Sequence, residues 1–287
     1  MGKILYRSAP PLNTWRRIAL GSWRDCGDPS VYGIIKLDMT AFQKRRELMK
    51  KARGAVPTPT LTAVMGRAVA LMMNRYPQLN GLIRFGTIWL RSNVDLFIQA
   101  SVDAEGAELS GVRVEMAETK TIDEIMTEVE AQNARVKSGE DPEFKRVKAR
   151  MGSVPPFLMR WVLDFTSYLI YTLNLDLTPF HVPRDPFGSV MITNIGSLGV
   201  DYAFAPLIPY SRVPLLLAVG AIKDEAVVRE GKLAVAPICN LVATMDHRFI
   251  DGVYGAKMMK LLQHYLETDE GLDELGFGTA PDGDGGR

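Results

Sequence analysis

A histidine and an aspartate stand four residues apart at the end of an apolar run, and a glycine follows them. They are His247, Asp251 and Gly252, in the stretch Asp246-His-Arg-Phe-Ile-Asp-Gly252. A neutral histidine can deprotonate a thiol, whose reference pKa is about 8.5, and the thiolate can then attack a thioester. The spacing favours such a general base on a loop that an ion pair holds in place. The attack passes through an oxyanion, so another segment must supply a hydrogen-bond donor.

The wider pattern Asp-His-Arg-x-x-Asp-Gly resembles the signature of the acyltransferase (E2) catalytic domain of the 2-oxoacid dehydrogenase complexes. That family is similar in fold to chloramphenicol acetyltransferase. Gly196-Ser-Leu-Gly-Val200 resembles its G-x-x-G-V turn, and Leu216-Leu-Ala-Val-Gly220 its I-L-A-V-G strand. Pro206 to Arg212 stands where the family has I-N-P-P-Q and departs from it. The resemblance implies an α/β (mixed α+β) fold, a chloramphenicol acetyltransferase-like mixed sheet flanked by helices.

The resemblance also assigns the oxyanion donor. Val190-Met-Ile-Thr-Asn-Ile-Gly196 is similar to the family's F-T-I-S-N-L-G, so Thr193 matches the donating serine, and Asn194 and Gly196 match its neighbours. Threonine keeps the hydroxyl, but its branched side chain is stiffer about χ1. His247 of one subunit would face Thr193 of the next across the subunit boundary of a trimer.

For Asp251 the resemblance implies a structural ion pair with an N-terminal arginine, not a contact with the histidine. Arg17, in Arg16-Arg-Ile-Ala19, is the best match to that arginine, and Arg16 is the alternative. Gly252 would let the chain turn tightly into the following helix. Asp251 and Arg17 would together hold the loop that carries His247.

The substrates and partners follow from the same resemblance. Coenzyme A would enter one end of the channel between subunits, and the acyl partner would enter the other. No lipoyl domain, subunit-binding domain or Ala/Pro linker precedes the catalytic part, so we expect a dihydrolipoyl group in trans, from lipoyl-domain or E1/E3-type partner proteins. The C-terminal tail lacks the family's apolar anchor between trimers, which favours a homotrimer over a cage.

Two other functions stay open at this point. One is a catalytically inactive, E2-like trimeric scaffold, which the missing modules and the threonine at position 193 favour. The other is a coenzyme A-dependent acyltransferase that acts on a small alcohol or amine, as in the antibiotic-modifying relatives. The Asp-His-Arg form argues against the small-molecule function, and the missing lipoyl domain argues for it.

Composition argues against several other classes of protein. The net charge is +1 and no Lys/Arg cluster is interleaved with aromatic residues, so nothing indicates nucleic-acid binding. His181 and His264 have no metal-ligand spacing, and we expect no metal. Cys26 and Cys239 form no C-x-x-C pattern, so we expect two reduced thiols in a cytoplasmic protein.

Hydrophobic patterns predict the elements that position these residues. We expect strands at 31–37, 82–85, 94–102, 188–196, 213–222 and 240–245, and helices at 39–51, from 61 to before Pro77, from 121 to 139, and after 252. Thr121-Ile-Asp-Glu124 is a capping box, and Glu230-Gly231 is typical of a hairpin turn. The irregular alternation favours a single E2-type domain over residues 1–267, followed by a flexible acidic, Gly-rich tail at 268–287.

Residues 141–185 resemble an insertion into the family pattern, and their second half is apolar. Arg160 and Asp164 interrupt that half, so no run of about 18 charge-free apolar residues exists to span a membrane. We expect most of it to pack in the core or at a subunit interface. A membrane-surface or partner contact through residues 157–177 is the alternative.

Overall fold

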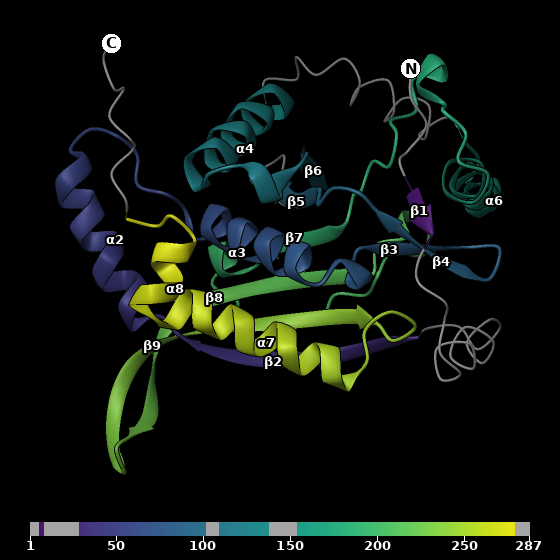
Figure 1. Ribbon diagram of the computed structural model, residues 1–287. Coiled ribbons are helices and arrows are strands. Elements are labelled where there is room, and N and C mark those ends of the chain that lie inside the picture. Colours follow the sequence, from purple (N-terminus) through teal and green to yellow (C-terminus); the bar gives the residue numbers. More distant parts are fainter. Residues whose placement is uncertain (1–5, 9–28, 102–108, 138–153, 279–287) are drawn as a thin grey trace.

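Within the residues that the computed structural model describes, 6–8, 29–101, 109–137 and 154–278, the main sheet has six strands in the order β2-β9-β8-β7-β5-β6 (Figure 1). These are β2 (Ser30–Asp38), β9 (Lys232–Asp246), β8 (Leu215–Arg229), β7 (Val190–Asn194), β5 (Leu96–Ser101) and β6 (Leu109–Val114). β7 pairs in parallel with β5 and β8, and the other neighbours are antiparallel. A smaller sheet has the order β1-β4-β3, from β1 (Tyr6–Ser8), β4 (Thr87–Arg91) and β3 (Gly81–Arg84). The sheet is therefore mixed, as predicted.

Helices α3, α4 and α7 lie across one face of the main sheet (Figure 1). The helices on this side are α2 (Thr40–Arg53), α3 (Leu61–Arg75), α4 (Ile122–Lys137), α7 (Gly252–Glu267) and α8 (Asp269–Glu274). The core lies between helices and sheet and includes Met65 of α3, Ile192 of β7 and Leu217 of β8, each at most 1% exposed. The first three residues of β7 are buried and Thr193 and Asn194 are half-buried, so the core holds the strand that carries the predicted oxyanion donor.

Two local sequence signals are confirmed. The backbone N–H of Glu124 donates to Thr121 Oγ1 at 3.2 Å, and the N–H of Thr121 donates to Glu124 Oε2 at 2.7 Å, which is a reciprocal capping box. The β8–β9 hairpin closes between Arg229 and Lys232, with φ of 51° at Glu230 and 77° at Gly231. Positive φ at both central residues defines a type I′ turn, whose twist matches the paired strands.

The opposite face of the main sheet carries exposed aromatic residues. Tyr32 and Ile34 of β2 point away from the helices and are 44% and 45% exposed, whereas their neighbour Ile35 is 4% exposed. Phe204 is 51% exposed and lies edge-on to Tyr32, with ring centroids 5.6 Å apart. Grouped apolar surface of this kind is typical of an interaction face.

The prediction of a flexible tail is wrong for residues 268–278. They contain α8, which packs on α2 and α7, and their apolar side chains are almost fully buried: Leu272, Leu275 and Phe277. Phe277 stacks on Phe42 with ring centroids 5.1 Å apart, and Arg45 forms ion pairs with two aspartates of α8. The acidic residues that suggested a solvated tail are thus the surface of a packed helix.

The described part of the predicted insertion begins with α6 (Pro156–Ser167), and a π-helical turn, Tyr168–Thr172, continues it. The turn packs inward, with Ile170 and Tyr171 buried against Leu82, which confirms the prediction of core packing there. Phe157 and Trp161 of α6 are 76% and 74% exposed in the single chain, and packing of this aromatic face at a subunit interface stays a prediction. No helix among the described residues is long and apolar enough to cross a membrane.

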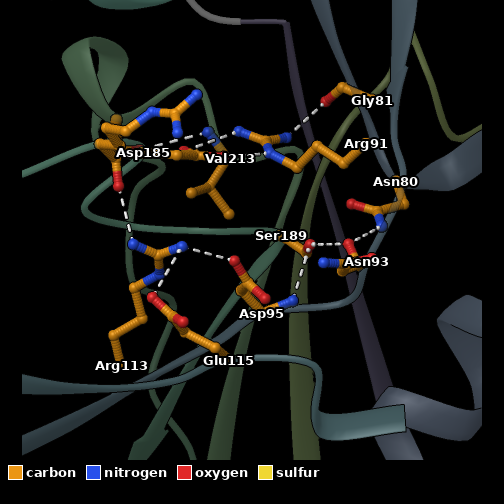
Figure 2. A network of polar contacts seen from close by, with 12 residues as sticks. Asn80, Gly81, Arg91, Asn93, Asp95, Arg113, Glu115, Asp185, Ser189 and Val213 are labelled. Carbon is orange, nitrogen blue, oxygen red and sulfur yellow. Dashed lines mark hydrogen bonds and ion pairs between the residues drawn. The ribbon is translucent and has the colours of Figure 1, made fainter. Parts of the chain in front are cut away.

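A polar network fastens the end of this segment to the sheets (Figure 2). Asp185, 4% exposed, accepts from Arg91 Nε at 2.6 Å and Nη2 at 3.2 Å. Arg113 of β6 donates to the Arg184 carbonyl at 2.7 Å and to Asp95 at 2.7 Å. This network fixes where the chain enters β7, the strand that carries Thr193.

Candidate active site

The His247 turn is built almost entirely from its own neighbours. β9 ends at Asp246, whose buried carboxylate binds Arg248 in a bidentate pair, with Nε at 2.9 Å and Nη2 at 2.6 Å. The N–H of Ile250 also donates to the Asp246 carbonyl at 3.0 Å. The backbone N–H of His247 donates to the carbonyl of Pro29 at 3.0 Å, which ties the turn to the start of β2.

The imidazole of His247 is half-buried and its tautomer follows from one contact. Nδ1 lies 2.9 Å from the carbonyl oxygen of Ile250. A carbonyl can only accept, so Nδ1 carries the proton and donates, and in the neutral ring the lone pair is at Nε2. The turn thus supplies the tautomer that a general base acting through Nε2 requires. Sequence reasoning missed Ile250, because a backbone carbonyl leaves no residue-type signal.

Asp251 is the N-cap of α7. Its Oδ1 accepts from the N–H of Tyr254 at 3.0 Å, and its φ of −91° and ψ of 177° are those of an extended cap residue. The predicted partners Arg17 and Arg16 lie outside the described residues. The reason predicted for Gly252 is wrong: Gly252 is the first residue of α7 and is not among the positive-φ glycines, and no atom of the described residues lies within 4 Å of where its Cβ would be.

Thr193 lies near the end of β7, beside Gln99 of β5 and Ala218 of β8 in the register. The next residue, Asn194, faces the helices and donates from Nδ2 to Thr62 Oγ1 of α3 at 2.9 Å. After it the chain turns at Gly196, where a Cβ would come within 2.5 Å of the Gly220 carbonyl oxygen. Only glycine allows this approach, so two of the predicted neighbours position the strand end.

A cavity of about 390 Å³ opens beside Thr193, between β5, β7 and the facing ends of α3 and α4. Its apolar wall includes Ala63, Ile98, Met126, Val129 and Leu198, and its polar wall includes Thr60, Thr62, Gln99, Glu130 and Asn133. Glu130 is the one charged side chain among the described residues that line it. A mainly apolar pocket with a few polar groups suits a neutral ligand end, such as an acyl group or an amide-bearing arm.

Within one chain, the structure does not bring His247 and Thr193 together. Thr193 pairs with Ala218, and Ala218 pairs with Val242, five residues before His247. With about 4.8 Å between strands and about 3.3 Å per residue, the two backbones are roughly 19 Å apart. Neither side chain can bridge that gap, and His247 does not line the cavity beside Thr193.

The described residues show neither a metal site nor a reactive cysteine. Among the described residues, no group of three or more His, Cys, Asp or Glu side chains could hold a metal ion. Burial raises the pKa of the Cys239 thiol to about 11, so it stays protonated near neutral pH and cannot serve as an acyl-carrying nucleophile. Cys26 lies outside the described residues.

A known family matches the C-terminal third of the chain. Residues 187–272 match the family described as 2-oxoacid dehydrogenases acyltransferase (catalytic domain). The acetyltransferase component of the pyruvate dehydrogenase complex of Rhizobium meliloti (strain 1021) is 33% identical over 86 residues, 30% of this chain and 19% of that protein. Its Bacillus subtilis (strain 168) counterpart is 37% identical over 82 residues, 29% of this chain and 18% of that protein. The chain thus covers under a fifth of these relatives.

The likeness of fold extends over nearly the whole chain. A probable dihydrolipoamide acetyltransferase from Listeria monocytogenes 4b F2365 has a TM-score of 0.62 at 17% identity, over 96% of this chain and 98% of that one. The dihydrolipoamide acetyltransferase of Azotobacter vinelandii has a TM-score of 0.63 at 17% identity, over 94% and 93% of the two chains. The predicted fold class and the resemblance are confirmed.

Proposed function

We propose that this chain, whose residues 187–272 belong to the catalytic-domain family of the 2-oxoacid dehydrogenase acyltransferases, moves an acyl group between a dihydrolipoyl thioester supplied in trans and coenzyme A. The observation that carries the proposal is the His247 turn. The turn places Nδ1 2.9 Å from the Ile250 carbonyl oxygen, so that in the neutral ring the proton is on Nδ1 and the lone pair is on Nε2. A base at Nε2 is what the attack of a thiol on a thioester needs.

In the proposed reaction, His247 Nε2 takes the proton of the attacking thiol. The thiolate sulfur bonds to the thioester carbonyl carbon, and the hydroxyl of Thr193 donates to the resulting oxyanion. The intermediate collapses as the bond to the leaving sulfur breaks, and the imidazolium returns the proton to that sulfur. No metal and no enzyme-bound acyl group are needed. In the Azotobacter vinelandii enzyme, which has a similar fold, the roles of a serine, a histidine and an asparagine in the catalytic mechanism were investigated.

The distance between the two groups favours a site shared by two copies of the chain. Because His247 and Thr193 are roughly 19 Å apart in one chain by strand geometry, a second copy must supply one of them. The exposed face of the main sheet, with Tyr32, Ile34 and Phe204, offers apolar surface for such an assembly. We propose a homotrimer with three equivalent sites, in which the Asp251 cap, with Arg17 as its proposed ion-pair partner, holds each catalytic turn.

The test is thioester exchange between acetyl-coenzyme A and free dihydrolipoamide. His247→Ala is expected to lower kcat by about 10²- to 10⁴-fold, the usual contribution of a general base. His264→Ala is the matched control, since His264 lies on α7 and pairs with Glu274 at 3.0 Å, away from the turn; its rate should equal that of the wild type. Equal rates in wild type and His247→Ala would rule out the catalytic role.

The exposed aromatic face of α6 favours a second candidate, a catalytically inactive trimeric scaffold. Phe157, Trp161 and Phe165 recur every four residues and are 76%, 74% and 63% exposed, which suits docking of a partner. A wild-type protein that forms trimers yet exchanges no acyl group with a free lipoyl domain would favour the scaffold.

A further inference from the structure

Two arginines, Arg212 and Arg248, lie near the His247 turn and affect each other electrostatically. In the β8–β9 ladder Leu215 pairs with Met245, and the N–H of Asp246 donates to the Pro214 carbonyl at 2.9 Å. Arg212 lies two residues before Pro214 and Arg248 two residues after Asp246, so this contact brings both arginines to the same end of the hairpin. The charge of Arg248 acts on Arg212, and two neighbouring cations are stabilised by an anion.

One of these arginines already has its anion. Arg248 is held by both carboxylate oxygens of Asp246. Arg212 donates from Nε to Ser167 Oγ of α6 at 3.1 Å, and no described carboxylate lies within ion-pair distance of it. Among the described carboxylates, Asp164 stabilises the charge of Arg212, but Asp164 is exposed and pairs with Arg160 at 3.6 Å.

The backbone of Arg212 is strained, and its surroundings disfavour the charged form of its side chain. Its φ is 55°, in the left-handed region that non-glycine residues rarely adopt. Burial lowers the pKa of the Arg212 guanidinium, and the charge of Arg248 lowers it further. A half-buried guanidinium in a strained position, next to another cation, is typical of a group that meets a ligand.

We propose that Arg212, beside Arg248, binds an anionic group, a phosphate or a carboxylate, carried by the acyl donor or acceptor. This inference rests on the proposed acyl transfer, and it adds that the acyl donor or acceptor carries a negative charge. The cavity beside Thr193 complements this assignment, because Glu130 and neutral side chains line it and would repel an anion. The anionic and neutral ends of the substrate would then meet different halves of the site. Guanidinium is suited to both oxyanions because it donates two parallel hydrogen bonds.

Binding and turnover are measured separately so that the two proposals can fail independently. Isothermal titration of wild type and Arg212→Gln uses coenzyme A, S-acetylpantetheine and S-succinylpantetheine as ligands. Glutamine keeps the approximate length and removes the charge. A charge-assisted hydrogen bond corresponds to roughly a 10- to 100-fold change in Kd. Repeating the titration on His247→Ala, which lacks the general base, shows whether the anion site stands without catalysis.

The ligands distinguish the two sources of negative charge. A loss of about 10-fold or more for coenzyme A alone assigns the phosphates, and the same loss for S-succinylpantetheine alone assigns a carboxylate on the acyl group. Arg160→Gln, which removes an exposed guanidinium from the same helix region, should bind all three ligands as the wild type does. The proposal is overturned if Arg212→Gln weakens none of the ligands, or all three equally.

Discussion

The His247 turn and the Thr193 strand end are built in opposite ways. The turn owes its shape to residues within four positions of His247: the Asp246–Arg248 pair, the Ile250 carbonyl and the Asp251 cap. The strand end owes its position to distant parts of the chain, through β5, β8 and Thr62 of α3. A locally built half-site can be recognised from a short motif, whereas a half-site built by long-range contacts is identifiable only through its place in the fold.

Substitution at the strand end tests whether Thr193 acts through its hydroxyl. Thr193→Ala is expected to lower kcat by about 10²- to 10³-fold, because one oxyanion donor is lost. Thr193→Ser keeps the hydroxyl, so its kcat should stay within a few-fold of the wild type. Kinetics of acetyl-coenzyme A exchange with both variants measure the difference. Equal rates in the alanine and serine variants would contradict the donor role.

Substitution at the turn tests the local cap, and its effect is smaller. Asp251→Ala removes the acceptor for the Tyr254 N–H and should lower the free energy of unfolding by about 1 kcal/mol. Asp251→Asn keeps a capping oxygen and should lose less. Urea unfolding of the two variants separates the cap from any contribution of the negative charge. If both variants lose the same stability, the cap is not what Asp251 contributes.

The sequence predicted much of the fold because local rules and tertiary packing agree over long stretches. The capping box at Thr121, the Glu230-Gly231 turn and the apolar helices all formed where their patterns indicated. The prediction of a flexible tail failed at residues 268–278 because it was based on their acidic, Gly-rich composition. Only the packing of Phe277 on Phe42 shows why an apolar side chain among acidic residues is buried.

The candidate site was predicted in its residue types and not in its geometry. The spacing of His247 and Asp251 predicted the turn. The Nδ1 of His247, however, contacts a backbone carbonyl, which no side-chain pattern encodes. Asp251 also caps α7, a contact that the spacing did not indicate, while its predicted arginine partners lie outside the described residues. The roughly 19 Å between the halves follows from strand order and register, which a motif does not contain.

Subunit complementation tests most directly whether the site lies between two copies of the chain. His247→Ala and Thr193→Ala chains, each inactive alone, are mixed under conditions that allow exchange, and hybrid trimers are purified with two different tags. In a hybrid with three equivalent interfaces, an intact His247 faces an intact Thr193 at about a third of the sites. The account predicts that purified hybrids recover about a third of the wild-type exchange activity. Hybrid assemblies with no more activity than either parent would contradict it.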